Sequence, residues 1–242
     1  MQDMEKPLVL CEVGDRSPFC LKVRRALIAA GLSYESRLAT MPSAFKALNP
    51  TGQVPVLLVG EEPVCDSTVI LARIASDLAP GAFRTDAESW LWEDYADRAL
   101  NGYLVAARWA DDANWPRVLD AYFGKAPWFV RKLVAPRIRK RVLGALAARD
   151  FLRVGPKALW DDFRRVLDAL EARAPRTGFW TSSDLSVADL GLFGQLHALR
   201  TPLTPGQAHE LELRPTLVDY LDRVDAATST KTAIVMPLRR AS

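Results

Sequence analysis

The chain has few of the residues from which metal sites and disulfide frameworks are built. Its 242 residues include two histidines, His197 and His209, and three cysteines. Two histidines cannot form a histidine-rich metal site, and the lack of paired Cys-x-x-Cys motifs argues against a structural zinc. A small, odd number of cysteines is typical of a protein from a reducing compartment rather than of a disulfide scaffold. We therefore expect no bound metal.

The chain also lacks long apolar runs and a strong excess of charge. No stretch approaches the roughly 18 consecutive apolar residues of a membrane-spanning helix, and the opening segment Met1–Pro7 is polar. Because no secretory leader is recognisable there, we expect a cytoplasmic location. A net charge of +3 is too small to indicate a nucleic-acid partner.

One segment departs from this even distribution of charge. The stretch from 131 to 141 is basic and contains no acidic residue, with Arg131, Lys132, Arg137, Arg139, Lys140 and Arg141. Such a run is typical of a solvated helix face, which is our expectation. An anionic partner or a membrane surface is the alternative, because Trp128 and Phe129 lie nearby. We expect neither a membrane nor a nucleic acid as partner.

The composition is that of a globular protein, with 49% hydrophobic and 25% charged residues. Residues 7–82 alternate strand-like and helical patterns. These patterns predict strands over 8–13, 34–38, 54–59 and 63–65 and helices over 18–30, 43–48 and 67–78. A β-α-β unit followed by a hairpin and a helix is the order of the thioredoxin fold. We therefore predict an α/β thioredoxin-like N-terminal domain over 7–82.

The pattern changes after a linker over 80–86. Apolar residues at helical spacing predict one long helix over 87–109, shorter pieces within 115–155, and helices over 156–174, 186–199 and 215–227. Ser186 and Asp189 have the spacing of a capping box, with aspartate in place of the usual glutamate. We predict an all-α C-terminal domain over 87–230.

The most informative motif is Ser17-Pro18-Phe19-Cys20. It follows a strand-like segment and precedes a helical pattern, which places Ser17 in a turn that opens a helix, with Pro18 at the first helical position. The start of a helix has unpaired N–H groups and a partial positive charge, which favour a thiolate or a carboxylate. The turn is therefore suited to sulfur chemistry. Serine before a helical proline is also an ordinary helix cap, and that alternative stays open.

Three segments, in this order and spacing, resemble the thioredoxin-like domain of the glutathione transferase superfamily. Residues 17–20 resemble a glutaredoxin-type Cys-Pro-Phe-Cys turn in which serine replaces the first cysteine. Residues 49–57 resemble the segment that carries the family's cis-proline, and Asp66-Ser67 resembles the motif that holds the glutamyl end of glutathione. The resemblance covers almost all of the first domain. In the second domain it is limited to helical character and to Ser186–Asp189.

The resemblance implies a glutathione transferase that takes glutathione as co-substrate and a small electrophile as second substrate, with a role in detoxification. Ser17 is then the catalytic residue, because a hydroxyl that donates a hydrogen bond to the glutathione sulfur favours the thiolate. Glutathione would be bound by Phe19, Gln53, Val54, Pro55, Asp66 and Ser67.

Each part of glutathione has an expected partner within this set. A cis Val54–Pro55 bond would turn backbone groups outward to pair with the peptide, and Gln53 would meet the glycyl carboxylate. Ser67 would cap the following helix and bind the glutamyl carboxylate, while Asp66 would pair with the ammonium group. The resemblance also implies a homodimer.

Two alternative functions stay open. The chain could be a non-catalytic protein-binding module of the same fold, or a glutathione-dependent oxidoreductase that uses Cys20. The second cysteine of such a turn is usually the less reactive thiol, so we expect Cys20 to be a small packed residue. We expect the same of Cys11 and Cys65.

Overall fold

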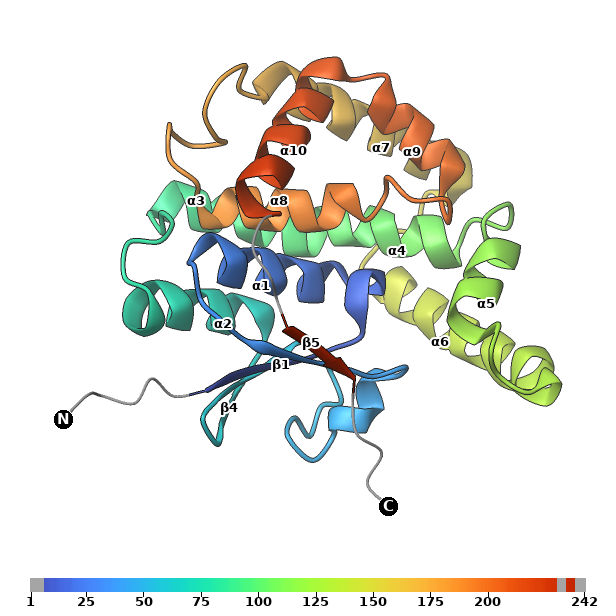
Figure 1. Ribbon diagram of the computed structural model, residues 1–242. Coiled ribbons are helices and arrows are strands. Elements are labelled where there is room, and N and C mark those ends of the chain that lie inside the picture. The colour runs from blue at the N-terminus through green and yellow to red at the C-terminus, as the bar shows by residue number, and fades with distance from the viewer. Residues whose placement is uncertain (1–6, 230–233, 238–242) are drawn as a thin grey trace. The chain divides into compact units, whose positions relative to one another are not determined.

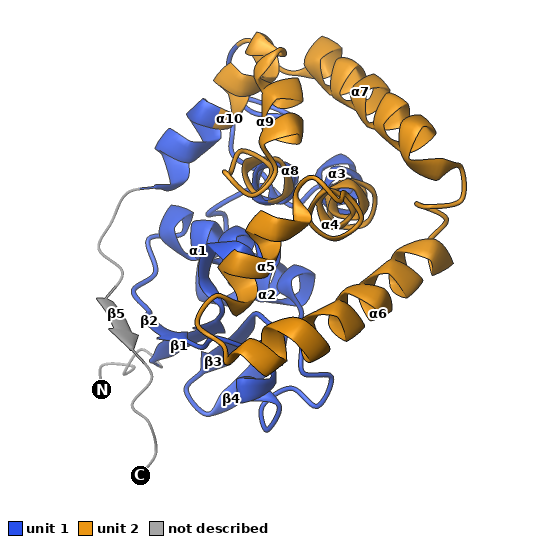
Figure 2. Cartoon of the chain, turned by 90° about the vertical axis from the view of Figure 1, so that its right-hand side faces the viewer, with its two compact units in different colours: residues 1–94, 177–194, 222–242 blue, residues 95–176, 195–221 orange. Residues whose placement is uncertain are grey.

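The computed structural model describes residues 7–229 and 234–237. The chain forms two compact units (Figure 2), of which the first combines residues 1–94, 177–194 and 222–242 and the second combines 95–176 and 195–221. The domain limits 7–82 and 87–230 stay a prediction, because a compact unit is a group of contacting residues rather than a separately folding piece. The expectation that no leader opens the chain concerns residues 1–6, which lie outside the described residues.

The first unit contains a mixed β-sheet. Its strands are β1 (Leu8–Glu12), β2 (Glu35–Leu38), β3 (Val56–Val59), β4 (Glu62–Cys65) and β5 (Ile234–Pro237), in the spatial order β4-β3-β1-β2-β5. β1 is parallel to β2 and antiparallel to β3, β3 and β4 form a hairpin, and β5 is parallel to β2. The parallel pair needs a crossover, which is α1 (Pro18–Ala29). The strands predicted within 7–82 are confirmed, whereas β5 was not predicted.

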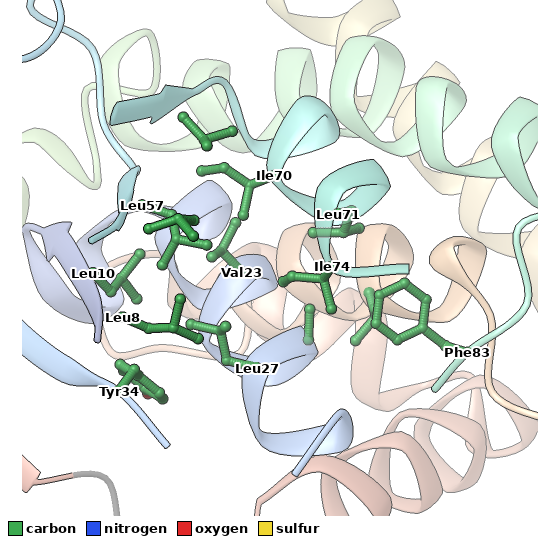
Figure 3. Packing of buried hydrophobic residues seen from close by; sticks show 14 of the residues in the cluster. Leu8, Leu10, Val23, Leu27, Tyr34, Leu57, Ile70, Leu71, Ile74 and Phe83 are labelled. Atoms are coloured by element: carbon green, nitrogen blue, oxygen red, sulfur yellow. The ribbon is translucent and has the colours of Figure 1, made fainter. Parts of the chain in front are cut away.

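Both faces of β1 are buried, which explains its unbroken apolar sequence. Alternate residues belong to different hydrophobic clusters, Leu8 and Leu10 to one and Val9 and Cys11 to the other. α1 and α2 (Ser67–Arg73) lie over the same side of the sheet (Figure 1). Their apolar side chains pack with the strands there (Figure 3), and the labelled members are Leu8, Leu10, Val23, Leu27, Tyr34, Leu57, Ile70, Leu71, Ile74 and Phe83. The second cluster includes Phe45, from the short 3-10 helix Pro42–Phe45.

Segments from later in the sequence complete the first unit. They include α3 (Ala87–Tyr95) up to residue 94, the first part of α8 (Val187–His197) and the end of α10 (Pro215–Thr228). One Asp189 oxygen accepts hydrogen bonds from the N–H of Ser186 at 2.8 Å and from its hydroxyl at 2.6 Å. The other oxygen accepts from the Trp180 N–H at 2.7 Å. The carboxylate part of the predicted capping box is therefore confirmed.

The second unit is helical. It contains α4 (Asn101–Trp109), α5 (Trp115–Phe123), α6 (Ala135–Ala148), α7 (Gly155–Arg173) and α9 (Pro205–Glu212), with parts of α8 and α10. The helix predicted over 87–109 consists of α3, a π-helical turn over Ala96–Leu100, and α4. α9 was not predicted, because its buried residues are only Gln207 and Leu211, which form no apolar stripe. An α/β unit and a helical unit together confirm the predicted fold class.

The basic segment 131–141 is paired in part rather than wholly solvated. It lies on a π-helical turn, Val130–Val134, and on α6. Arg131 lies 3.3 Å from a carboxylate oxygen of Asp120, and Arg139 lies 2.6 Å from one of Asp112. Nowhere in the described part of the chain does a helix combine the length and the apolar character that are needed to cross a bilayer.

Candidate functional site

The three motifs from the sequence meet at one edge of the sheet. In the β-ladder the C-terminal end of β1, Val56 at the start of β3 and Cys65 at the end of β4 lie side by side. Ser17 lies in the turn that follows β1, Pro55 directly precedes β3 and Asp66 directly follows β4. The strand register therefore brings together residues that are up to fifty positions apart in the sequence.

Ser17 is the N-cap of α1, as the sequence predicted. Its Oγ accepts a hydrogen bond from the Cys20 N–H at 3.3 Å, and Pro18 occupies the first helical position. A serine hydroxyl has one donor and two acceptor sites, so the capping bond leaves its O–H able to donate to a ligand. Ser17 and Phe19 are half-buried. A ligand atom at this turn would meet both a hydroxyl donor and the positive end of a helix.

A buried carboxylate supports this turn from behind. Glu12, at the end of β1, is buried; it lies 2.7 Å from Arg24 of α1 and accepts a hydrogen bond from the Ser36 hydroxyl. Arg24 also lies 2.7 Å from Asp15, within the turn itself. Burial lowers the pKa of the Arg24 guanidinium, but the two neighbouring carboxylates outweigh burial and raise this pKa above its usual value. The network connects strand, turn and helix, and no local sequence pattern had indicated it.

Two cysteines of the first unit, Cys11 and Cys20, are unsuited to nucleophilic chemistry. Burial raises the pKa of the Cys20 thiol to about 11, although a side-chain hydrogen bond between this thiol and the Ser17 hydroxyl acts in the opposite direction. Burial likewise raises the pKa of the Cys11 thiol to about 11. Both groups are therefore protonated at neutral pH, and the thiolate is the nucleophilic form. Cys65 is half-buried, and its Sγ lies 3.7 Å from the carbonyl oxygen of Leu48.

The loop before β3 is held by Asn49, which is buried. Its side-chain amide donates to the Gln53 carbonyl at 3.0 Å, and its Oδ1 accepts from the Thr51 hydroxyl at 2.8 Å. The Val54–Pro55 peptide is cis, as the family resemblance implied. Gln53 is exposed, and within the described residues the Val54 N–H has no hydrogen-bond partner. An unpaired backbone donor can pair with an extended peptide as an added strand does.

Asp66, and not Ser67, is the N-cap of α2. Its Oδ1 accepts hydrogen bonds from the N–H groups of Thr68 at 2.9 Å and Val69 at 3.2 Å. Ser67 is the first helical residue and is buried, so the capping role predicted for it was wrong. Asp66 also has a positive φ of 76°, an unusual backbone conformation for a residue with a side chain. Both capping bonds use Oδ1, which leaves Oδ2 able to accept from a ligand.

A second buried network links α1, α2 and α3. Lys22 of α1 and Glu93 of α3 form a buried ion pair with an N–O distance of 2.6 Å, and the Thr68 hydroxyl donates to the same carboxylate oxygen at 2.8 Å. The Lys22 ammonium also lies 5.8 Å from the ring centre of Phe19. Sequence reasoning missed these residues, since an ion pair between distant positions has no local signal. In the described part of the chain, no group of three acidic, histidine or cysteine side chains is arranged to hold a metal ion.

Two family profiles match the chain. The N-terminal domain of glutathione S-transferases matches residues 16–77, and the C-terminal domain matches residues 134–223. The chain belongs to the glutathione transferase superfamily. This assignment confirms the predicted enzyme class and glutathione as the co-substrate of the family.

This glutathione transferase has relatives of low sequence identity. It is 24% identical to isoprene-epoxide–glutathione S-transferase of Rhodococcus sp. (strain AD45), over 88% of this chain and 92% of that protein. It is 23% identical to failed axon connections of Drosophila melanogaster, over 86% of this chain but only 53% of that protein, so it spans about half the length of this relative. The crystal structure of β-etherase LigF from Sphingobium sp. strain SYK-6 is similar with a TM-score of 0.62 and 24% identity, over 94% of this chain and 96% of that one. This likeness shows the fold.

Proposed function

We propose that this glutathione transferase binds glutathione at the sheet edge described above and activates its thiol for attack on an electrophilic carbon. The observation that carries the proposal is the strand register, which brings the Ser17 turn, the Val54–Pro55 loop and the Asp66 turn to one edge. Two of these elements are helix starts, which attract negative charge. Glutathione has a thiol that must ionise and two carboxylates, so its charges suit such a site.

Ser17 is the proposed catalytic residue. A free thiol of this kind has a pKa of about 8.5, so little thiolate exists at neutral pH. The Ser17 O–H donates to the sulfur and the start of α1 adds a positive potential, and both favour the thiolate. The capping bond from the Cys20 N–H to Ser17 Oγ supports this role, because it orients the oxygen and leaves the proton available for the ligand.

The other residues hold the tripeptide. The Val54 N–H, which has no partner among the described residues, pairs with the peptide backbone as an added strand would. Gln53 meets the glycyl carboxylate. Asp66 binds the glutamyl ammonium through Oδ2, while the start of α2 with Ser67 binds the glutamyl carboxylate. Phe19 and Pro55 complete the proposed binding set.

The second substrate is proposed to be a small molecule with a carbon–oxygen bond that can be broken. The names of two relatives support this class, one acting on an epoxide and one being a β-etherase. In the proposed reaction the thiolate sulfur forms a bond to carbon and the carbon–oxygen bond breaks. The departing oxygen takes a proton from solvent.

We test this function by titrating dialysed protein with glutathione in a calorimeter and then measuring glutathione consumption with an epoxide and with an aryl ether. We expect saturable heat and turnover of at least one electrophile. Absence of saturable heat would contradict a glutathione site. Binding without any turnover would instead support the non-catalytic module. Burial and the raised thiol pKa of Cys20 argue against the oxidoreductase.

A homodimer, a cytoplasmic location and a role in detoxification are part of the same proposal. They rest on the family resemblance rather than on contacts in the chain. Light scattering at micromolar concentration should give a mass twice that of the chain, and a monomeric mass would exclude the dimer.

A further inference from the structure

The buried ion pair between Lys22 and Glu93 lies next to the proposed site without being part of it. The side chains of Lys22 and Glu93 are only 1% and 3% exposed. Neither can therefore touch a bound tripeptide. Yet Lys22 lies early in α1, the helix that Ser17 caps, and its partner Glu93 accepts a hydrogen bond from Thr68 in the first turn of α2.

One carboxylate oxygen thus joins the two helix starts. Glu93 Oε1 lies 2.6 Å from Lys22 Nζ and 2.8 Å from the Thr68 hydroxyl. The Thr68 N–H in turn donates to Asp66 Oδ1 at 2.9 Å. The contacts therefore run from α1, which Ser17 caps, through Glu93 to Asp66, the residue proposed to bind the glutamyl ammonium.

Stability alone does not explain this arrangement. α1 and α2 already pack through an apolar cluster that contains Val23, Leu27, Ile70 and Ile74 (Figure 3). Burying two opposite charges costs desolvation that their attraction often fails to recover, so apolar residues of similar size would hold the helices as well or better. What an ion pair adds is direction, since its hydrogen bonds fix one relative position of the partners.

We propose that Lys22, Glu93 and Thr68 are positioning residues that set the distance between the Ser17 hydroxyl and the Asp66-Ser67 turn. The inference rests on the proposed function, in which one glutathione molecule spans both turns. A ligand held at two points is sensitive to their separation, and a misplacement of about 1 Å can cost about a hundredfold in rate. Apolar packing allows small helix shifts that this network prevents.

The decisive variant replaces the pair by apolar residues of similar volume, Lys22→Met with Glu93→Leu. Single replacement of Lys22 would leave a buried carboxylate without its counter-charge and is expected to destabilise the fold. The double variant should melt close to the wild type. We expect its dissociation constant for glutathione to rise at least tenfold and the pKa of the bound thiol, followed by thiolate absorbance against pH, to rise as well.

Two further variants keep the test decisive if the double variant does not fold. Thr68→Val removes only the hydroxyl and should weaken glutathione binding about threefold to tenfold, whereas Thr68→Ser retains the hydroxyl and should bind as the wild type does. The matched control is Arg25→Met with Asp225→Leu, which removes another ion pair of α1, with an N–O distance of 2.6 Å. It should leave the thiol pKa unchanged.

The outcomes separate the two proposals. If the wild type does not bind glutathione, the proposed function fails and the positioning role fails with it. If the wild type binds glutathione and a folded double variant, or Thr68→Val, binds it equally well with the same thiol pKa, only the positioning role is overturned.

Discussion

Replacement of Ser17 by alanine removes two interactions that can be measured separately. The first is the cap of α1, in which Ser17 Oγ accepts from the Cys20 N–H at 3.3 Å. The second is the proposed hydrogen bond from the Ser17 hydroxyl to the glutathione sulfur. The cap acts on the free protein, whereas the second bond acts on the bound thiolate. Stability and the pH profile of the reaction therefore report on different bonds.

The magnitudes follow from the kind of bond. Loss of a serine cap costs about 1 kcal/mol of unfolding free energy, and the length of this bond favours the lower half of the usual range. A hydrogen bond to a charged group contributes about 1.5–3 kcal/mol. Since one pKa unit corresponds to about 1.36 kcal/mol, its loss should raise the pKa of the bound thiol by about one to two units. The sign is upward because the lost bond stabilised the charged form.

The assay is kcat/KM for the electrophile, measured against pH at saturating glutathione. Ser17→Ala should lower the rate at neutral pH about tenfold to a hundredfold and move the inflection to higher pH, so that part of the loss is recovered in alkaline solution. Ser17→Thr keeps a hydroxyl at the same position and is the control, with a profile close to that of the wild type. A lower melting temperature with an unchanged pH profile would refute the catalytic role and leave Ser17 as a helix cap.

Three further predictions concern the rest of the site. Asp66→Ala should lose the cap of α2, about 1 kcal/mol of unfolding free energy and glutathione affinity, whereas Asp66→Asn keeps the cap and should lose affinity alone. Urea denaturation measures the stability and calorimetry the affinity, and normal glutathione binding by both variants would show that Asp66 does not bind the glutamyl group. Cys20→Ala should keep the pH profile of conjugation, because burial raises the pKa of this thiol to about 11 and so keeps it protonated at neutral pH. A large loss of turnover would instead support the alternative function, an oxidoreductase that uses Cys20. Asn49→Ala removes the hydrogen bond to the Gln53 carbonyl and should raise KM for glutathione several-fold with a smaller change in kcat. An unaltered KM in steady-state kinetics would show that this hydrogen bond does not hold the loop in its binding conformation.

Much of the fold could be predicted because its signals are local. The apolar runs of β1 and β3, the proline after Ser17 and the helical spacing in α1 each identify an element from neighbouring residues. The start of α2 at residue 67 was predicted correctly, but its N-cap was assigned to Ser67 instead of Asp66, because aspartate and serine are both good caps and only the backbone decides between them. β5 was missed because it pairs with β2, almost two hundred residues earlier.

The motifs of the candidate site could be recognised in the sequence, whereas the buried groups that support them could not. The three motifs are short segments that a sequence can display, and the strand register confirms that they share an edge. The groups that hold them are buried charges whose partners are far away in the sequence. Lys22 and Glu93 are separated by 71 positions, and neither is remarkable in its own segment. Burial holds the lysine side chain in one position, and burial is a property of the folded chain rather than of the local sequence.

These distant partners bear on where the first domain ends. Lys22, in the helix that Ser17 caps, forms a buried ion pair with Glu93 of α3. Gly194 of α8 lies so close to the same helix that a Cβ there would come within 2.9 Å of the Pro18 carbonyl oxygen. A piece that ends at residue 82 lacks both elements, so Lys22 loses its ion pair with Glu93 and the side of α1 that α3 and α8 contact becomes exposed to water. We therefore expect such a piece to show weak amide protection in α1 by hydrogen exchange and no saturable glutathione binding. Full protection of α1 in the isolated piece would mean that the predicted limit at residue 82 is a true folding boundary.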